Sequence, residues 1–94
     1  MLIGHFRNKY REMKHYTYIL KCADDTLYTG CTNNLERRLK QHNKSKQGAH
    51  YTKIRRPVKL IYSETFNDLK NARAREAEIK KLSQKKKAEL TKNF

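Results

Sequence analysis

Alternating apolar and polar positions near the start of the chain predict a β-hairpin. Residues 16–22 and 26–31 are rich in the β-branched and aromatic side chains that favour strands, and they flank the polar segment 23–25. The last residue of that segment, Asp25, tolerates the left-handed backbone conformation that a three-residue hairpin loop requires. We therefore expect two antiparallel strands joined by a three-residue loop.

The length of this loop decides which side chains share a face of the sheet. If Cys22 pairs with Thr26, all even-numbered residues of both strands lie on one face, because the side-chain period of a strand is two. Tyr18 and Tyr28 then point the same way. A loop of two or four residues would place these tyrosines on opposite faces.

Capping signals and helical periodicity predict three helices after the hairpin. Asn33, followed three residues later by Glu36, resembles a capping box that opens a helix through about residue 43. A second helix is expected from residue 67 or 68 to about residue 82, and Ser83 can cap a third through residue 90. The segment 43–57 is expected to be a polar, basic loop.

Segment 58–64 predicts a third strand, with Val58, Leu60 and Tyr62 on one face. A chain of 94 residues buries only about 60% of the surface of its unfolded state, so we expect one domain with one small core. That domain is expected to span residues 16–94, after a basic extension formed by residues 1–15.

The formal net charge of +14 arises from 23 Lys and Arg against 9 Asp and Glu. Such an excess costs self-repulsion in the folded state, so it predicts an acidic partner such as a polyphosphate. No apolar run approaches the roughly 18 residues of a membrane-spanning helix, and no signal peptide is visible. We expect a cytoplasmic protein without a membrane partner, in which Cys22 and Cys31 are free thiols.

Glu76 is the carboxylate of the second helix that is expected to face inward. At about 100° per residue it falls between Leu69 on one side and Ala72 and Ile79 on the other, inside the apolar arc. A lone inward carboxylate is costly unless a cation or several donors compensate it. Two partners are open: an arginine that orients the helix, or a hard cation such as Mg²⁺.

Arg38 and His42 lie four residues apart on the first helix and therefore share a face. Both fall to one side of the apolar stripe formed by Leu35 and Leu39, so we expect them at the edge of the core. On a basic helix such residues are often solvated or contact phosphate. An arginine fork can also neutralise charge that builds on phosphate oxygens in a transition state.

Two tyrosine motifs in the hairpin resemble those that name the GIY-YIG nuclease family, and the resemblance extends over about residues 16–82. The first motif reads Tyr-Thr-Tyr and ends at Tyr18, and the second reads Tyr-Thr-Gly and begins at Tyr28. Tyr16 replaces the family's first glycine, which could narrow access to the site. The family's late asparagine has no clear counterpart, and Asn93 is a weak candidate for it. The resemblance implies an α+β fold, with a small three-stranded antiparallel sheet and flanking helices in the order β-β-α-β-α-α.

The resemblance also implies an active site. Arg38 matches the family's catalytic arginine, Glu76 its metal-binding glutamate, and His42 a histidine found in part of the family. The implied activity is that of a Mg²⁺- or Mn²⁺-dependent endonuclease, in which Tyr18 or Tyr28 helps to deprotonate the attacking water. To ionise near neutral pH, a phenol with a pKa of about 10 needs roughly 4 kcal/mol of differential stabilisation, which a cation or His42 could supply.

Basic and aromatic side chains near this site could contact a nucleic acid, which we expect to be DNA. The candidates are Arg37, Lys40, His50, Tyr51, Lys53, Arg55 and Arg56. An ordinary charged loop would have the same composition. The alternative function is a nuclease scaffold that binds DNA or RNA without cutting it, and a third is a structural role beside a nucleic acid or a partner protein. Because no element resembles a base-reading helix, we expect cleavage to depend on DNA structure rather than sequence.

Overall fold

The computed structural model describes residues 13–92, so nearly all of the expected extension, and Asn93, lie outside the described part. Three strands form one antiparallel sheet in the order β2-β1-β3. The fold is α+β as expected, with one short additional helix, α3, between the first helix and the third strand. The elements are β1 His15–Lys21, β2 Leu27–Thr32, α2 Leu35–Lys44, α3 His50–Lys53, β3 Lys59–Phe66, α4 Leu69–Lys80 and α5 Gln84–Thr91.

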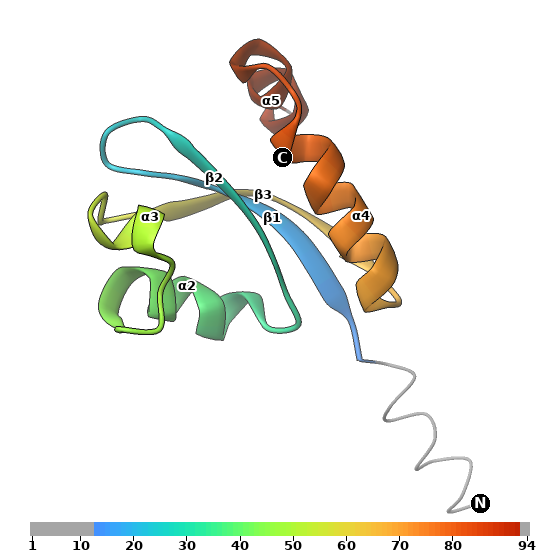
Figure 1. Ribbon diagram of the computed structural model, residues 1–94, viewed down its shortest axis with the longest axis horizontal. Helices are drawn as coiled ribbons and strands as arrows, with labels where there is room; N and C mark the ends of the chain where they lie inside the picture. Colours follow the sequence, from blue (N-terminus) through green and yellow to red (C-terminus); the bar gives the residue numbers. More distant parts are fainter. Residues whose placement is uncertain (1–12, 93–94) are drawn as a thin grey trace, which may run out of the picture.

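Helices cover both faces of the sheet (Figure 1). Leu35 and Leu39 of α2 pack with a buried cluster that includes Tyr18 and Leu20 on one face. On the other face Ala72 of α4 is fully buried, and its carbonyl accepts a hydrogen bond of 2.6 Å from the hydroxyl of Thr17. The helices of residues 13–92 are all too short or too polar to cross a membrane.

The hairpin has the expected three-residue loop. The backbone N–H of Cys22 donates to the carbonyl of Thr26 at 2.9 Å, and Asp25 adopts a φ of 66°. In the resulting register Tyr18 lies opposite Gly30. Even-numbered residues of β1 and β2 therefore share the face that α2 covers, and the prediction that Tyr18 and Tyr28 point the same way is confirmed.

The expected alternation along the third strand is wrong. Leu60 lies opposite Leu20, but Tyr62 lies opposite Ile19, so a β-bulge inserts one extra residue into β3 at Ile61. Leu60 packs into the cluster on the α2 face, whereas Tyr62 points to the α4 face. There the hydroxyl of Tyr62 donates to a carboxylate oxygen of Glu64.

The capping residue of α2 is Asn34 rather than Asn33. The side chain of Asn34 accepts the backbone N–H of Arg37 at 3.0 Å, and its own N–H is bonded to the hydroxyl of Thr32. This second bond extends the β-like backbone by one residue, which moves the helix start. Ser83 caps α5 as expected, and its hydroxyl accepts the N–H of Lys86.

Arg56 anchors the end of α2. Its guanidinium donates to the backbone carbonyls of Gln41, His42 and Ser45, which lie in and just after the last turn of the helix. The last carbonyl groups of a helix lack intrahelical partners and carry partial negative charge. A cationic side chain there supplies both hydrogen-bond donors and positive charge. Arg56 therefore holds α2 and the residues that α2 carries.

We expect Arg56→Gln to lower the free energy of unfolding by about 2 kcal/mol, because charge-assisted bonds to these carbonyls are lost. The matched variant Arg37→Gln, at an exposed position of the same helix, should cost less than about 0.5 kcal/mol. Urea denaturation followed by circular dichroism measures both. Equal stability of the two variants would contradict the anchoring role.

Candidate active site

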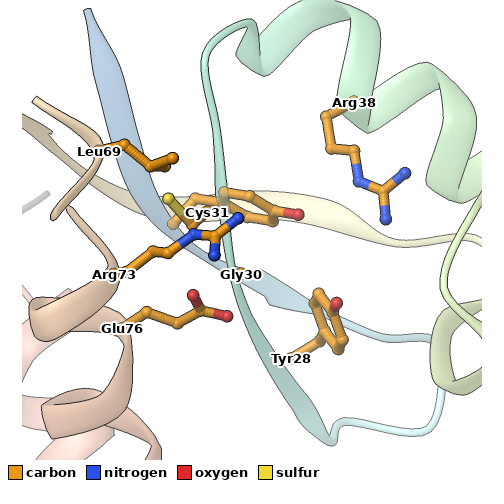
Figure 2. A pocket seen from close by; sticks show the side chains of 8 residues that line it. Tyr28, Gly30, Cys31, Arg38, Leu69, Arg73 and Glu76 are labelled. Carbon is orange, nitrogen blue, oxygen red and sulfur yellow. The ribbon is translucent and has the colours of Figure 1, made fainter.

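A groove of about 360 Å³ opens at the edge strand β2 (Figure 2). Arg73 and Glu76 reach toward the strand from α4, whereas Tyr28 and Arg38 lie on its other side. The groove therefore joins residues from both faces of the sheet around an edge. Its lining residues are Tyr18, Tyr28, Gly30, Cys31, Arg38, Leu69, Arg73 and Glu76.

The absence of a side chain at Gly30 makes room for the ring of Tyr18. A Cβ atom there would lie 2.6 Å from Cζ of Tyr18 and closer still to the phenol oxygen. The Tyr18 ring therefore occupies the space above its cross-strand partner. Tyr16, expected to narrow access, pairs with Thr32 instead and is not among the described residues that line the groove.

Glu76 faces the groove with 21% of its side chain exposed. Its carboxylate lies 3.0 Å from the ammonium of Lys80, one turn further along α4. Of the two partners that the sequence left open, an arginine does not pair with Glu76 among residues 13–92. Arg75 pairs instead with Glu64 at 2.9 Å and with Glu78 at 3.1 Å. The partner of Glu76 is therefore a lysine of its own helix.

Arg38 is held in place by a glutamine and a loop carbonyl. Its Nη1 donates to Oε1 of Gln41 and to the backbone oxygen of Gln47, each at 2.9 Å. Arg38 also lines the groove together with Tyr18, and its guanidinium acts on the phenol of Tyr18. This arrangement provides a fixed positive charge beside a phenol.

His42 lies deeper than expected. We predicted it at the edge of the core, but it is 0% exposed, because the short helix α3 packs over it. Its Nε2 lies 2.8 Å from the hydroxyl of Tyr18, and its Nδ1 lies 2.7 Å from Oγ1 of Thr52. A continuous hydrogen-bonded chain thus runs from the groove into the core.

Burial shifts the pKa values of Tyr18 and His42 in opposite directions. Burial raises the pKa of Tyr18 above its usual value, and the charge of Arg38 offsets only part of that rise. Burial, together with the charges of Arg38 and Arg56, lowers the pKa of His42 from 6.5 to about 4. Both groups are therefore neutral at pH 7, and His42 alone does not supply the stabilisation that an ionised Tyr18 would need.

Aromatic rings continue from the groove toward α3. The ring of Tyr28 lies 5.0 Å from that of His42 and 6.1 Å from that of Tyr51. The guanidinium of Arg55 covers the Tyr51 ring at 3.8 Å and donates to Asp24 of the hairpin loop. Tyr51 is therefore packed within the protein on both sides, which limits its use as a platform for a base.

The other expected nucleic-acid contacts differ in how free they are. Arg37, Lys40 and His50 are exposed, and Lys53 is half-buried. Lys40 pairs only loosely with Glu36, at 3.9 Å between largely exposed side chains. Arg55 and Arg56 use their guanidinium groups for bonds within the protein.

Two residues of this site were not predicted from the sequence. Arg73 lies one turn before Glu76 on the same face of α4, so the helical periodicity that identified Glu76 could also have identified it. Thr52 carries no such signal, because it meets His42 only through the packing of α3 on α2. Within residues 13–92, Arg73 has no ion pair or hydrogen bond.

A family model described as the GIY-YIG catalytic domain matches residues 14–89. The UPF0213 protein of Syntrophus aciditrophicus is 54% identical over 79 residues, which are 84% of this chain and 91% of that protein. These matches confirm the resemblance that the tyrosine motifs indicated.

Two solved structures share the fold. The solution NMR structure of the UPF0213 protein BH0048 from Bacillus halodurans has 42% identity and a TM-score of 0.55, covering 85% of this chain and 84% of that one. The protein EF2693 from E. faecalis has 40% identity and a TM-score of 0.60, covering 89% and 88%. The expected strand and helix order is therefore confirmed in experimentally determined relatives.

We expect the buried His42 to make stability depend on pH. Because its pKa falls from 6.5 to about 4 on folding, the unfolded state binds a proton first as the pH drops. Between pH 7 and pH 4 the free energy of unfolding should decrease by roughly 3 kcal/mol from this group.

Urea midpoints measured between pH 7 and pH 5, above most carboxyl titration, isolate this effect. His42→Gln should flatten the dependence, whereas His50→Gln, at an exposed position, should leave it unchanged. An equal slope in the wild-type protein and His42→Gln would refute the assignment.

Proposed function

The chain belongs to the GIY-YIG family of nuclease domains, and from this premise we propose that it is a metal-dependent endonuclease that hydrolyses phosphodiester bonds in DNA. The observation that carries the proposal is the groove at β2, which one guanidinium of α2, two phenols of the hairpin and one carboxylate of α4 line together. We further propose that it selects DNA structure rather than sequence, in the cytoplasm.

Glu76 is the residue that would hold the metal. Residues 13–92 contain no cluster of three acidic, histidine or cysteine side chains, so a cation would take one protein carboxylate and complete its shell with water and substrate oxygens. Mg²⁺ accepts such an arrangement because it retains several waters, and Mn²⁺ is also compatible with oxygen ligands. When bound, the ion would supply positive charge to the phosphate and the leaving oxygen.

A cation that binds Glu76 must displace Lys80. The ammonium of Lys80 already neutralises the carboxylate of Glu76 at 3.0 Å. More than half of the Lys80 side chain is exposed, which leaves it free to swing into solvent. The half-buried carboxylate of Glu76 would therefore have a cationic partner both before and after the metal ion binds.

Tyr18 and His42 can accept the proton of the attacking water as a pair. Tyr18 receives a proton from water while its own proton passes to Nε2 of His42, so the phenol is never fully ionised. The raised pKa of Tyr18 leaves almost no phenolate at neutral pH, and the lowered pKa of His42 makes its imidazole a weak base when it acts alone. Negative charge on a bound phosphate favours the imidazolium that results. Tyr28 lines the same groove and would position the phosphate or the water.

Two guanidinium groups flank the groove and would bind the phosphate from opposite sides of β2. Arg38 is fixed by Gln41 and Gln47, and it would neutralise charge on the reacting phosphate. Arg73 has no partner among residues 13–92 and lies beside Glu76. The exposed Arg37, Lys40 and His50, with Lys53, would contact the DNA backbone further along α2 and α3.

We expect Glu76→Gln to reduce cleavage by roughly a thousandfold, a loss of about 4 kcal/mol of transition-state stabilisation, with DNA affinity nearly unchanged. The matched control is Glu78→Gln, because Glu78 lies on the same helix but is 67% exposed and paired with Arg75. Purified protein, Mg²⁺ or Mn²⁺, and labelled nicked, branched and linear DNA provide the assay.

Two outcomes would count against the enzyme. Cleavage retained by Glu76→Gln would exclude the proposed metal site. Salt-sensitive binding of DNA or RNA by wild-type protein without cleavage of any substrate in either metal would instead indicate the binding module, because phosphate contacts alone release counterions.

Arg73→Gln should raise KM for DNA about tenfold and lower the salt dependence of binding by about one counterion. Lys59→Gln removes the same charge from β3, the opposite edge strand, and should change KM less than about twofold. Steady-state kinetics at two salt concentrations compare them. Indistinguishable KM values would remove Arg73 from the phosphate site.

A further inference from the structure

We infer that Thr52 is a positioning residue that fixes the tautomer of His42, so that Nε2 faces Tyr18 as a proton acceptor. The inference deepens the proposed function and rests on it where catalysis is concerned. It depends on three hydrogen bonds in sequence: Tyr18 to His42 at 2.8 Å, His42 to Thr52 at 2.7 Å, and Thr52 to the carbonyl of Ala49 at 2.9 Å.

The direction of each bond follows from the donors available. The carbonyl of Ala49 also accepts the backbone N–H groups of Thr52 and Lys53, and because it can only accept, the single hydroxyl proton of Thr52 is the donor of their 2.9 Å bond. Oγ1 of Thr52 must then accept a proton from Nδ1 of His42. A neutral imidazole carries one N–H, which leaves Nε2 with a lone pair that accepts the proton of Tyr18.

The other tautomer satisfies fewer groups. With the proton on Nε2, Thr52 would have to turn its hydroxyl from Ala49 to Nδ1, and His42 would donate to the oxygen of Tyr18. Two of the three bonds would remain. The hydroxyl proton of Tyr18, which is 2% exposed, would need a new acceptor. His42 and Thr52 are both 0% exposed, so solvent offers no substitute on that side.

This orientation matters for the proton path. Only an unprotonated Nε2 can take the proton of Tyr18 while Tyr18 takes one from water. If Nε2 carried the proton instead, His42 would be a donor to Tyr18 and the path would be blocked. Thr52 therefore acts on the reaction through His42, although it lies outside the groove.

The test is the tautomer itself, read from ¹⁵N chemical shifts of the imidazole in uniformly labelled protein near neutral pH. In wild-type protein we expect a protonated Nδ1 and an unprotonated Nε2. Thr52→Val removes the acceptor at nearly constant shape and leaves a buried N–H on Nδ1 without a partner, so the proton should shift to Nε2, where the oxygen of Tyr18 accepts it and the phenol proton turns to the groove. Thr52→Ser keeps the hydroxyl and should restore the wild-type shifts.

Thr17→Val is the matched control for loss of a buried threonine hydroxyl. Its hydroxyl also donates to a backbone carbonyl, that of Ala72, but on the opposite face of the sheet. It should leave the shifts of His42 unchanged. Cleavage by Thr52→Val should fall at least tenfold, with Thr52→Ser near wild type.

Each outcome decides a separate claim. Wild-type protein with the proton on Nε2 overturns the inference, even if Thr52→Val does not fold. A shifted tautomer in Thr52→Val with full cleavage overturns the catalytic consequence. If wild-type protein has the expected tautomer but cuts no DNA, the nuclease proposal fails while the assignment of the tautomer to Thr52 stands.

Discussion

The contact between the Tyr18 ring and the bare backbone of Gly30 is the constraint on which the site depends. The ring of Tyr18 fills the space where any other residue at position 30 would carry Cβ. Because β2 is an edge strand, the groove passes around this edge of the sheet. The carboxylate of α4 and the guanidinium of α2 therefore line one groove, although the two helices cover opposite faces (Figure 1).

The positive charge of the chain is divided between two uses. Arg55 and Arg56 bind Asp24 and the carbonyls at the end of α2, so they fix the loop and helix that surround His42. Arg38 and Arg73 face the groove instead. The number of basic residues is therefore a poor measure of phosphate binding. The hydrogen bonds of the structure show which arginines stabilise the fold and which remain available to a ligand.

The sequence predicted features that follow from local geometry and missed those that need tertiary packing. The odd hairpin loop was predictable, because a side-chain period of two fixes faces once Asp25 supplies a left-handed residue. The bulge at Ile61 was not, since it arises where β3 adjusts to β1, and it reversed the expected face of Tyr62.

The same distinction holds for the candidate site. Helical periodicity was enough to predict that Glu76 faces inward, and in the structure it lines the groove. The depth of His42 and its bond to Thr52 depend on α3, a single turn of helix in a segment that reads as a basic loop.

Burial of the Tyr18 and His42 pair has a consequence for how such a site can work. Neither group, taken alone, serves well as a base, since burial disfavours both the phenolate of Tyr18, which becomes scarce, and the imidazolium of His42, whose imidazole becomes a weaker base. Passing one proton through both groups avoids the phenolate altogether and forms only the imidazolium. In the proposed mechanism that cation would form beside a bound phosphate, whose charge would offset those of Arg38 and Arg56. Deep burial would then keep the pair neutral until substrate is present, and such a site would need orientation of the imidazole more than a permanently shifted pKa.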